Sequence, residues 1–214
     1  MTHSFDKAYW DQIWQGDRAI AMAAGQPNPH LVRELDGFAP GTALDAGCGA
    51  GTEAIWLATQ GWQVTAADIA TEALARASER AAAGGVADRV RCVEADLSTW
   101  EPDVRYDLVT THYAHPTIPQ LVFYDRIASW VAPAGTLFIV GHLHDAHAAH
   151  GHGHGHGETE PPASASVTAA AITARLDPIV WEVVTAQEWH QDVTGQGGRH
   201  LPIHDVIVRA RRRT

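Results

Sequence analysis

Residues 42–70, TALDAGCGAGTEAIWLATQGWQVTAADIA, decide the fold of this chain. The stretch opens with a short apolar strand, Thr42–Ala46, which runs into a glycine-rich loop. A helix over Glu53–Gln60 follows, Gly61 ends it, and Trp62–Ala67 is a second apolar strand. Near-continuous apolar strands that alternate with helices are typical of a parallel sheet covered by helices on both faces.

The same alternation continues outward along the chain. It predicts helices and strands over Thr71–Ala83, Val90–Ala95, Asp107–Thr111, Pro119–Val131, Thr136–Val140 and Thr168–Leu176. Two β-branched runs, Ile179–Glu188 and His204–Arg209, flank a glycine-rich turn and predict an antiparallel hairpin. We therefore expect an α/β fold with a single doubly wound sheet, mostly parallel, that ends in a C-terminal antiparallel hairpin.

One domain is expected over residues 1–214, because a chain of this length with 45% hydrophobic residues can bury one core but is short for two. Residues 1–40, with short helices over Phe5–Trp14 and His30–Asp36, are predicted to form an N-terminal helical cap. Residues 142–162 are rich in glycine, alanine and histidine, and nothing apolar there is large enough to pack. They are predicted to be a flexible His-rich insertion.

The acidic composition excludes several classes of partner. With 25 acidic and 15 basic side chains the formal net charge is −10, so we expect no nucleic acid partner. Only two cysteines occur, Cys48 and Cys92, and no leading apolar segment is visible, which indicates a reducing, cytoplasmic location. No apolar run approaches the roughly 20 residues that a membrane-spanning helix needs, so no membrane partner is expected. The sequence leaves the oligomeric state open.

The glycine-rich loop, residues 47–51, lies where glycines let the backbone approach a ligand and where a helix N-terminus offers N–H groups. Dinucleotide enzymes place G-x-G-x-x-G at this point, so a nicotinamide-dependent oxidoreductase is an alternative function. Here Gly47, Gly49 and Gly51 follow G-x-G-x-G, Thr52 occupies the closing position, and Asp45 precedes the loop. These departures point away from a dinucleotide.

Two further acids stand at the ends of the next strands. Asp68 ends the second strand, where a carboxylate can accept both ribose hydroxyls of an adenosine. Asp96 follows the third strand and could accept from an adenine amino group, although an acid in either place is also a common helix cap or turn former. Because parallel strands end at one edge of a sheet, Asp45, Asp68 and Asp96 together predict one crevice at the topological switch point.

Residues 43–70 resemble motif I and its successor in class I S-adenosylmethionine-dependent methyltransferases. The resemblance extends over Thr42–Val140 and implies a Rossmann-like sheet of strand order 3-2-1-4-5-7-6, with S-adenosylmethionine as cofactor and S-adenosylhomocysteine as its product. The chain also resembles small bacterial methyltransferases of the tellurite-resistance and thiopurine types. The family likeness implies a cofactor site in which Asp45, Gly47 and Gly49 flank the methionine part and Asp68 holds the ribose. The adenine then lies against Ile69, Asp96 and Leu97, and Cys48 in the glycine-rich loop is a further cofactor-binding residue.

The methyl acceptor is predicted at the end of the fourth strand, and it is expected to be a small molecule with a sulfur, oxygen or nitrogen nucleophile. A thiolate needs little help, whereas a hydroxyl benefits from a base such as histidine. His112, Tyr113 and His115 are therefore the candidate catalytic residues, although each could merely hydrogen-bond a loop. An aromatic group on the first helix either closes over the substrate as a lid or packs that helix onto the sheet: Tyr9, Trp10 and Trp14.

Seven histidines lie between His142 and His156, and neutral imidazoles bind Zn²⁺, Ni²⁺, Cu²⁺ and Co²⁺. The Gly-His repeat has no fixed geometry and no paired carboxylate, so any divalent metal held there is expected to be adventitious, and no metal ligand is predicted. A histidine-rich metal-binding protein on a methyltransferase-like fold is the second alternative function. The segment leaves the fifth strand at the same edge as the cofactor site, so it could cover the acceptor.

Overall fold

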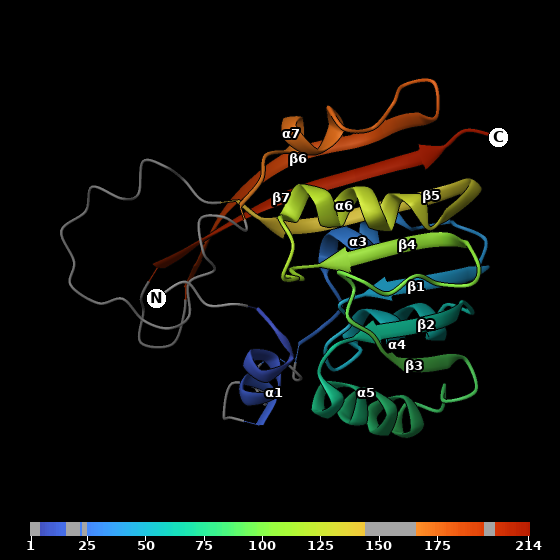
Figure 1. The fold of residues 1–214 in the computed structure, drawn as a ribbon, viewed down its shortest axis with the longest axis vertical. Helices are drawn as coiled ribbons and strands as arrows, with labels where there is room; N and C mark the ends of the chain where they lie inside the picture. The colour runs from blue at the N-terminus through green and yellow to red at the C-terminus, as the bar shows by residue number, and fades with distance from the viewer. Residues whose placement is uncertain (1–4, 16–21, 23–24, 144–165, 195–199) are drawn as a thin grey trace.

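The computed structural model describes residues 5–15, 22, 25–143, 166–194 and 200–214 (Figure 1). Its centre is a seven-stranded sheet in the order β3-β2-β1-β4-β5-β7-β6, in which β7 runs antiparallel to both β5 and β6. The predicted fold class and strand order are thus confirmed. The strands are β1 (Thr42–Ala46), β2 (Gln63–Asp68), β3 (Val90–Glu94), β4 (Tyr106–His112), β5 (Val131–His142), β6 (Trp181–Thr194) and β7 (His200–Arg212).

Two apolar cores lie on opposite faces of this sheet. Neighbouring residues of β5 serve different cores, since Leu137 and Ile139 belong to one and Phe138 and Val140 to the other. The first core packs against α6 and α7, and the second against α3, α4 and α5. The helices of the described chain are α1 (Lys7–Gln15), α3 (Pro29–Glu34), α4 (Thr52–Thr59), α5 (Thr71–Ala83), α6 (Gln120–Ser129) and α7 (Ala169–Thr173).

Some predicted elements end at other residues in the structure, because hydrogen-bonded pairing of the backbone extends beyond the apolar side-chain pattern. Strands β6 and β7 continue beyond their apolar runs, because their antiparallel pairing extends from Trp181↔Arg212 to Thr194↔His200. Helix α7 ends at Thr173 and does not reach Leu176. The turn expected between the two strands, at 195–198, lies outside the described residues.

The predicted subdivision of the chain is described only in part. Within residues 1–40, α1 lies beside α5 and α3 packs on the sheet (Figure 1). Of the predicted insertion at 142–162, residues 144–162 lie outside the described residues, and the flexibility expected there stays a prediction. None of the helices described is long and apolar enough to cross a lipid bilayer.

The parallel strands β1, β2, β3 and β4 bring their carboxyl ends to one edge of the sheet. In the parallel pairings Asp45 lies opposite Ala66 and Thr110, and Asp68 lies opposite Glu94. The loops that follow β1, β2, β3 and β4 therefore meet at this edge, where open parallel sheets bind ligands.

Candidate active site

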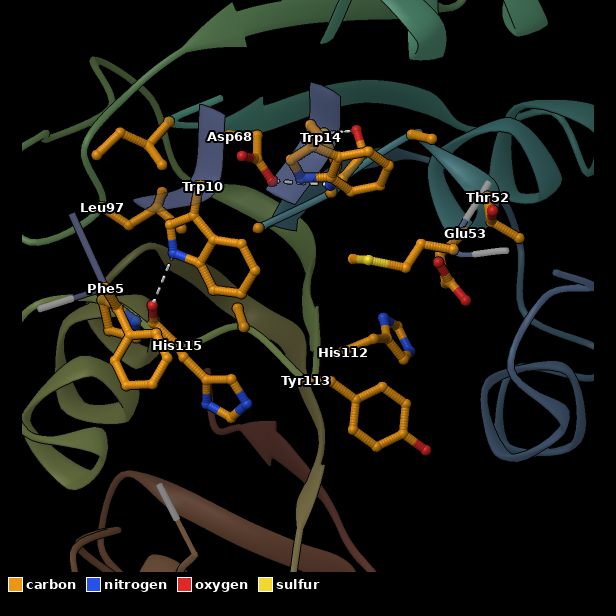
Figure 2. A pocket seen from close by; sticks show the side chains of 18 of the residues that line it. Phe5, Trp10, Trp14, Thr52, Glu53, Asp68, Leu97, His112, Tyr113 and His115 are labelled. Carbon is orange, nitrogen blue, oxygen red and sulfur yellow. Dashed lines mark hydrogen bonds between the residues drawn. The ribbon is translucent and has the colours of Figure 1, made fainter. Parts of the chain in front are cut away.

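A cavity of about 300 Å³ opens at the carboxyl edge of the sheet (Figure 2). Its wall is formed by α1, the glycine loop and the segments that follow β2, β3 and β4. The predicted site residues line it, with two exceptions: Asp45 and Tyr9 are not part of the wall that the described residues form. Sequence reasoning therefore located one site, and the roles of its individual residues stay predictions.

Positive backbone φ angles shape the glycine loop. The φ angle is +81° at Gly47 and +52° at Gly49, in the left-handed region that favours glycine. A Cβ atom on Gly47 would overlap that of Ala114, and one on Gly49 would lie 2.9 Å from Cζ2 of Trp14. These two glycines are therefore required by packing, whatever the loop binds.

Asp68 ties the glycine loop to the end of β2. Its carboxylate accepts hydrogen bonds from the backbone N–H groups of Gly49 at 2.8 Å and Ala70 at 2.9 Å. The residue is only 9% exposed and still reaches the cavity wall. Burial raises the pKa of the Asp68 carboxyl, while the two accepted hydrogen bonds oppose that rise.

Asp45 lies beneath the loop, on β1, and is 1% exposed. Its Oδ2 has no hydrogen-bond partner among the described residues, and its Oδ1 is 4.0 Å from Nδ1 of His112. Burial, reinforced by the negative charges of Glu53 and Asp68, raises the pKa of Asp45 well above its usual range. The acid expected against the cofactor's methionine part is thus buried behind the wall, and a direct contact stays a prediction.

The predicted adenine side of the site is apolar with one polar group. Ile69 and the buried Leu97 line the cavity, and Asp96, which precedes Leu97 in the segment after β3, lines it too. Asp96 Oδ1 accepts from the backbone N–H of Ser98 at 2.8 Å, so this acid also forms the local turn that its position suggested. Cys48 is a buried free thiol in the wall, and burial raises its pKa well above the usual range.

His112 ends β4 and points into the cavity (Figure 2). Its side chain is 6% exposed, and neither ring nitrogen has a hydrogen-bond partner among the described residues. Burial lowers the pKa of His112, a shift that the positive charge of His30 reinforces and the negative charge of Glu53 opposes. The imidazole is therefore neutral near pH 7 and can accept a proton.

Tyr113 and His115 follow in a loop with unusual backbone geometry. Tyr113 has a φ angle of +55°, and its hydroxyl accepts from Asn28 Nδ2 at 3.3 Å and also bonds Asp205. Burial holds the pKa of this phenol far above its usual range, so it stays protonated. The rings of Tyr113 and His115 both stack on His142, with centroid distances of 4.5 and 5.4 Å.

The aromatic residues of α1 divide between packing and the cavity. Trp14 is 3% exposed and packs in a small apolar cluster with Ala50, Ala70 and Ala73. Trp10 is half-buried in the cavity wall, and its Nε1 donates to the His115 carbonyl at 3.3 Å. Tyr9 contacts Trp10 edge-on from outside that wall. Both tryptophans line the cavity, Trp14 is the more deeply buried of the two, and a lid role for either stays a prediction.

The polar residues that were missed from the sequence include Glu53, in the cavity wall, and Asn28, which contacts it. Glu53 lies in the cavity wall on the side of His112 and Tyr113 (Figure 2), and an acid in the first turn of a helix is easily explained by the helix dipole alone. Glu53 Oε1 accepts from the backbone N–H of Asn28 at 3.2 Å, and the Asn28 side chain caps α3 by accepting from His30 N. The Asn-Pro pair before a helix was the signal for this cap.

Metal ligation is not organised within the described part of the chain, where no group of three or more His, Cys, Asp or Glu side chains could hold an ion. From the predicted metal-binding run only His142 is described, and it stacks between the rings of Tyr113 and His115. The remainder of that run, up to His156, lies outside the described residues, so adventitious metal binding there stays a prediction.

Comparison with known proteins matches residues 43–135 to the family described as "Methyltransferase domain". A stretch of 102 residues is 29% identical to thiocyanate methyltransferase 1 of Arabidopsis thaliana, over 47% of this chain and 44% of that protein. A 63-residue stretch is 41% identical to ribosomal RNA small subunit methyltransferase C of Alcanivorax borkumensis, over 28% of this chain and 19% of that protein. The chain thus spans less than half the length of these curated relatives.

A solved structure extends the likeness to the whole fold. The magnesium protoporphyrin IX methyltransferase of Synechocystis, with bound S-adenosylmethionine, matches with a TM-score of 0.65 and 18% identity over 100% of both chains. At that identity the likeness shows a shared architecture, including the strand order. Residues 43–135 thus match a methyltransferase domain, and the chain has the architecture of a solved methyltransferase structure that holds S-adenosylmethionine.

Proposed function

We propose that this protein transfers the methyl group of S-adenosylmethionine to a small-molecule acceptor in the cavity at the carboxyl edge of the sheet. One observation carries the proposal. The buried carboxylate of Asp68, the glycine loop that it holds, and the neutral imidazole of His112 line one cavity.

The residues of this cavity fit the family's cofactor. Each carboxylate oxygen of Asp68 accepts one backbone N–H and has a further lone pair, so the pair can accept both hydroxyls of a ribose. Ile69 and Leu97 offer apolar surface to an adenine ring. Gly47 and Gly49 bring the backbone close to the ligand without side chains.

The bound cofactor supplies a methyl group already activated on a sulfonium sulfur. The chain's own residues then have to hold the acceptor in line with that group and exclude water. Trp10 and Phe5 cover one part of the cavity, and His112 and Tyr113 border the other. Positioning in a largely apolar space is the contribution that these side chains can make.

Sulfur is the acceptor atom that we favour. The chain resembles proteins named thiocyanate methyltransferase and probable thiol methyltransferase, at 29% and 30% identity. A soft sulfur nucleophile attacks a sulfonium methyl with little further assistance. A ribosomal RNA acceptor fits less well, because the net charge of −10 offers little attraction to a phosphate backbone.

Calorimetric titration of the purified, metal-free protein with S-adenosylhomocysteine, S-adenosylmethionine and NAD⁺ tests the cofactor. We expect micromolar binding of the first two and none of NAD⁺; binding of NAD⁺ alone would favour the nicotinamide-dependent alternative instead. Release of S-adenosylhomocysteine with panels of small thiols, alcohols and amines then tests the acceptor atom. The sulfur assignment fails if only alcohols or amines support turnover.

A further inference from the structure

We infer that the methyl acceptor is an uncharged thiol that arrives with its proton, and that His112 takes this proton as the methyl group is transferred. The inference rests on the proposed function and names its substrate class. It separates this protein from relatives named thiocyanate methyltransferase, since thiocyanate is an anion that carries no proton.

His112 has an unmet hydrogen-bonding capacity within the described residues. The His112 side chain is more than nine-tenths buried, lines the cavity, and has two ring nitrogens without a hydrogen-bond partner among the described residues. Buried polar atoms in folded proteins almost always have a partner, so an orphaned pair facing a ligand cavity calls for one from the ligand. A neutral imidazole offers one acceptor nitrogen, and a thiol S–H is the matching donor.

The carboxylates in the described cavity wall make the surroundings of an acceptor negative. The described wall contains the acidic residues Glu53, Asp68 and Asp96 and neither lysine nor arginine. An anionic acceptor would leave water for a space bordered by carboxylates, with no cationic side chain of this part of the chain to replace its hydration. An uncharged acceptor avoids that desolvation cost.

His112 is placed to receive the proton of the thiol. As the acceptor's S–H bond breaks, its sulfur forms the new S–CH₃ bond, and the electron pair of the broken sulfonium C–S bond stays on the sulfur that leaves as a thioether. The proton passes to a ring nitrogen of His112. The resulting imidazolium faces Glu53 on α4, whose negative charge favours it, and His30 on α3, which opposes it when protonated. The buried carboxyl of Asp45 on β1 lies 4.0 Å from Nδ1 of His112.

The test compares acceptors that differ in their need for a base. Wild type, His112→Gln and His190→Gln are assayed for release of S-adenosylhomocysteine with 2-mercaptoethanol, with the more acidic thiophenol, and with thiocyanate. His190 lies exposed on β6, away from the cavity, and serves as the matched control. Calorimetric titration with S-adenosylhomocysteine verifies that each variant keeps its folded cofactor site.

We expect wild type to prefer the thiols to thiocyanate. His112→Gln should lower kcat/KM for 2-mercaptoethanol by about 100-fold or more, as removal of a general base typically does, and should lower it much less for thiophenol, whose more acidic proton needs less help from a base. In wild type, kcat/KM for 2-mercaptoethanol should also fall as the pH drops through the His112 pKa, because a protonated imidazole cannot accept.

Equal losses for both thiols in His112→Gln would overturn the inference, as would faster wild-type turnover of thiocyanate than of either thiol. Binding of S-adenosylhomocysteine without turnover of any thiol would also refute the acceptor class while leaving the cofactor site standing. Absence of S-adenosylhomocysteine binding in wild type would instead overturn the proposed function.

Discussion

Replacing Asp68 by alanine removes a buried carboxylate that accepts two backbone hydrogen bonds, from Gly49 and Ala70. Hydrogen bonds to a charged group contribute roughly 1.5–3 kcal/mol each, but the variant also removes the cost of burying the charge. We therefore expect the free energy of unfolding to fall by about 2 kcal/mol, which lowers Tm by about 4–8 °C in a protein of this size. In this variant the glycine loop loses the hydrogen bond from Gly49 N that connects it to the end of β2.

The same substitution removes the group that we expect to hold the cofactor's ribose. Two lost hydrogen bonds to a charged acceptor correspond to about 3 kcal/mol, so Kd for S-adenosylhomocysteine should rise about 100-fold. Isothermal titration calorimetry at pH 7.5 measures this change, and differential scanning calorimetry measures the Tm.

Asp107→Ala is the matched control for this experiment. Asp107 also accepts two hydrogen bonds, from N and Oγ1 of Thr42, but it stands at the opposite end of the sheet. We expect it to lower Tm without changing affinity for S-adenosylhomocysteine. If Asp68→Ala leaves Kd within threefold of wild type, or if Asp107→Ala weakens binding as much, the assignment of Asp68 to the cofactor is refuted.

Three further predictions follow from individual contacts. Asp45 has its pKa raised by burial above the ordinary 3.8, so its contribution to stability is present below about pH 4 and is lost as the pH rises through the raised value. Asp45→Asn should therefore gain in Tm over wild type as the pH rises from 4 to 8, and a difference that stays constant with pH would contradict this. Trp14→Ala should lower the free energy of unfolding by about 3 kcal/mol, or Tm by roughly 10 °C, because the side chain is buried. Trp10→Phe should leave Tm nearly unchanged and raise the KM for the acceptor. The opposite pattern in calorimetry and kinetics would identify Trp14 as the lid. Gly47→Ala should unfold at a lower temperature than wild type, because the new Cβ overlaps that of Ala114 and the φ angle is positive. Adding Ala114→Gly should recover part of the lost Tm, since it removes the overlap but not the backbone strain. No recovery in thermal melts would show that the overlap contributes nothing.

Local patterns were sufficient for most of the fold. Apolar strands such as Thr42–Ala46 and Trp62–Ala67 can be predicted from their composition, and Gly61 and Gly84 mark where helices end. Both signals can be recognised in a short stretch of sequence, because they depend on neighbours in the chain. The order of the strands came with the family likeness. Strand ends were less accurate, since pairing between β6 and β7 depends on the partner strand as well as on the side chains.

The sequence by itself therefore determined the sheet, the glycine loop and the edge at which the site lies, because the direction of a parallel strand places its carboxyl end. Only the tertiary structure decided which side chains reach the cavity. It buried Asp45 behind the wall, packed Trp14 against Gly49, and left the nitrogens of His112 facing the ligand space. These outcomes depend on contacts between residues far apart in the chain, for which short-range spacing carries no information.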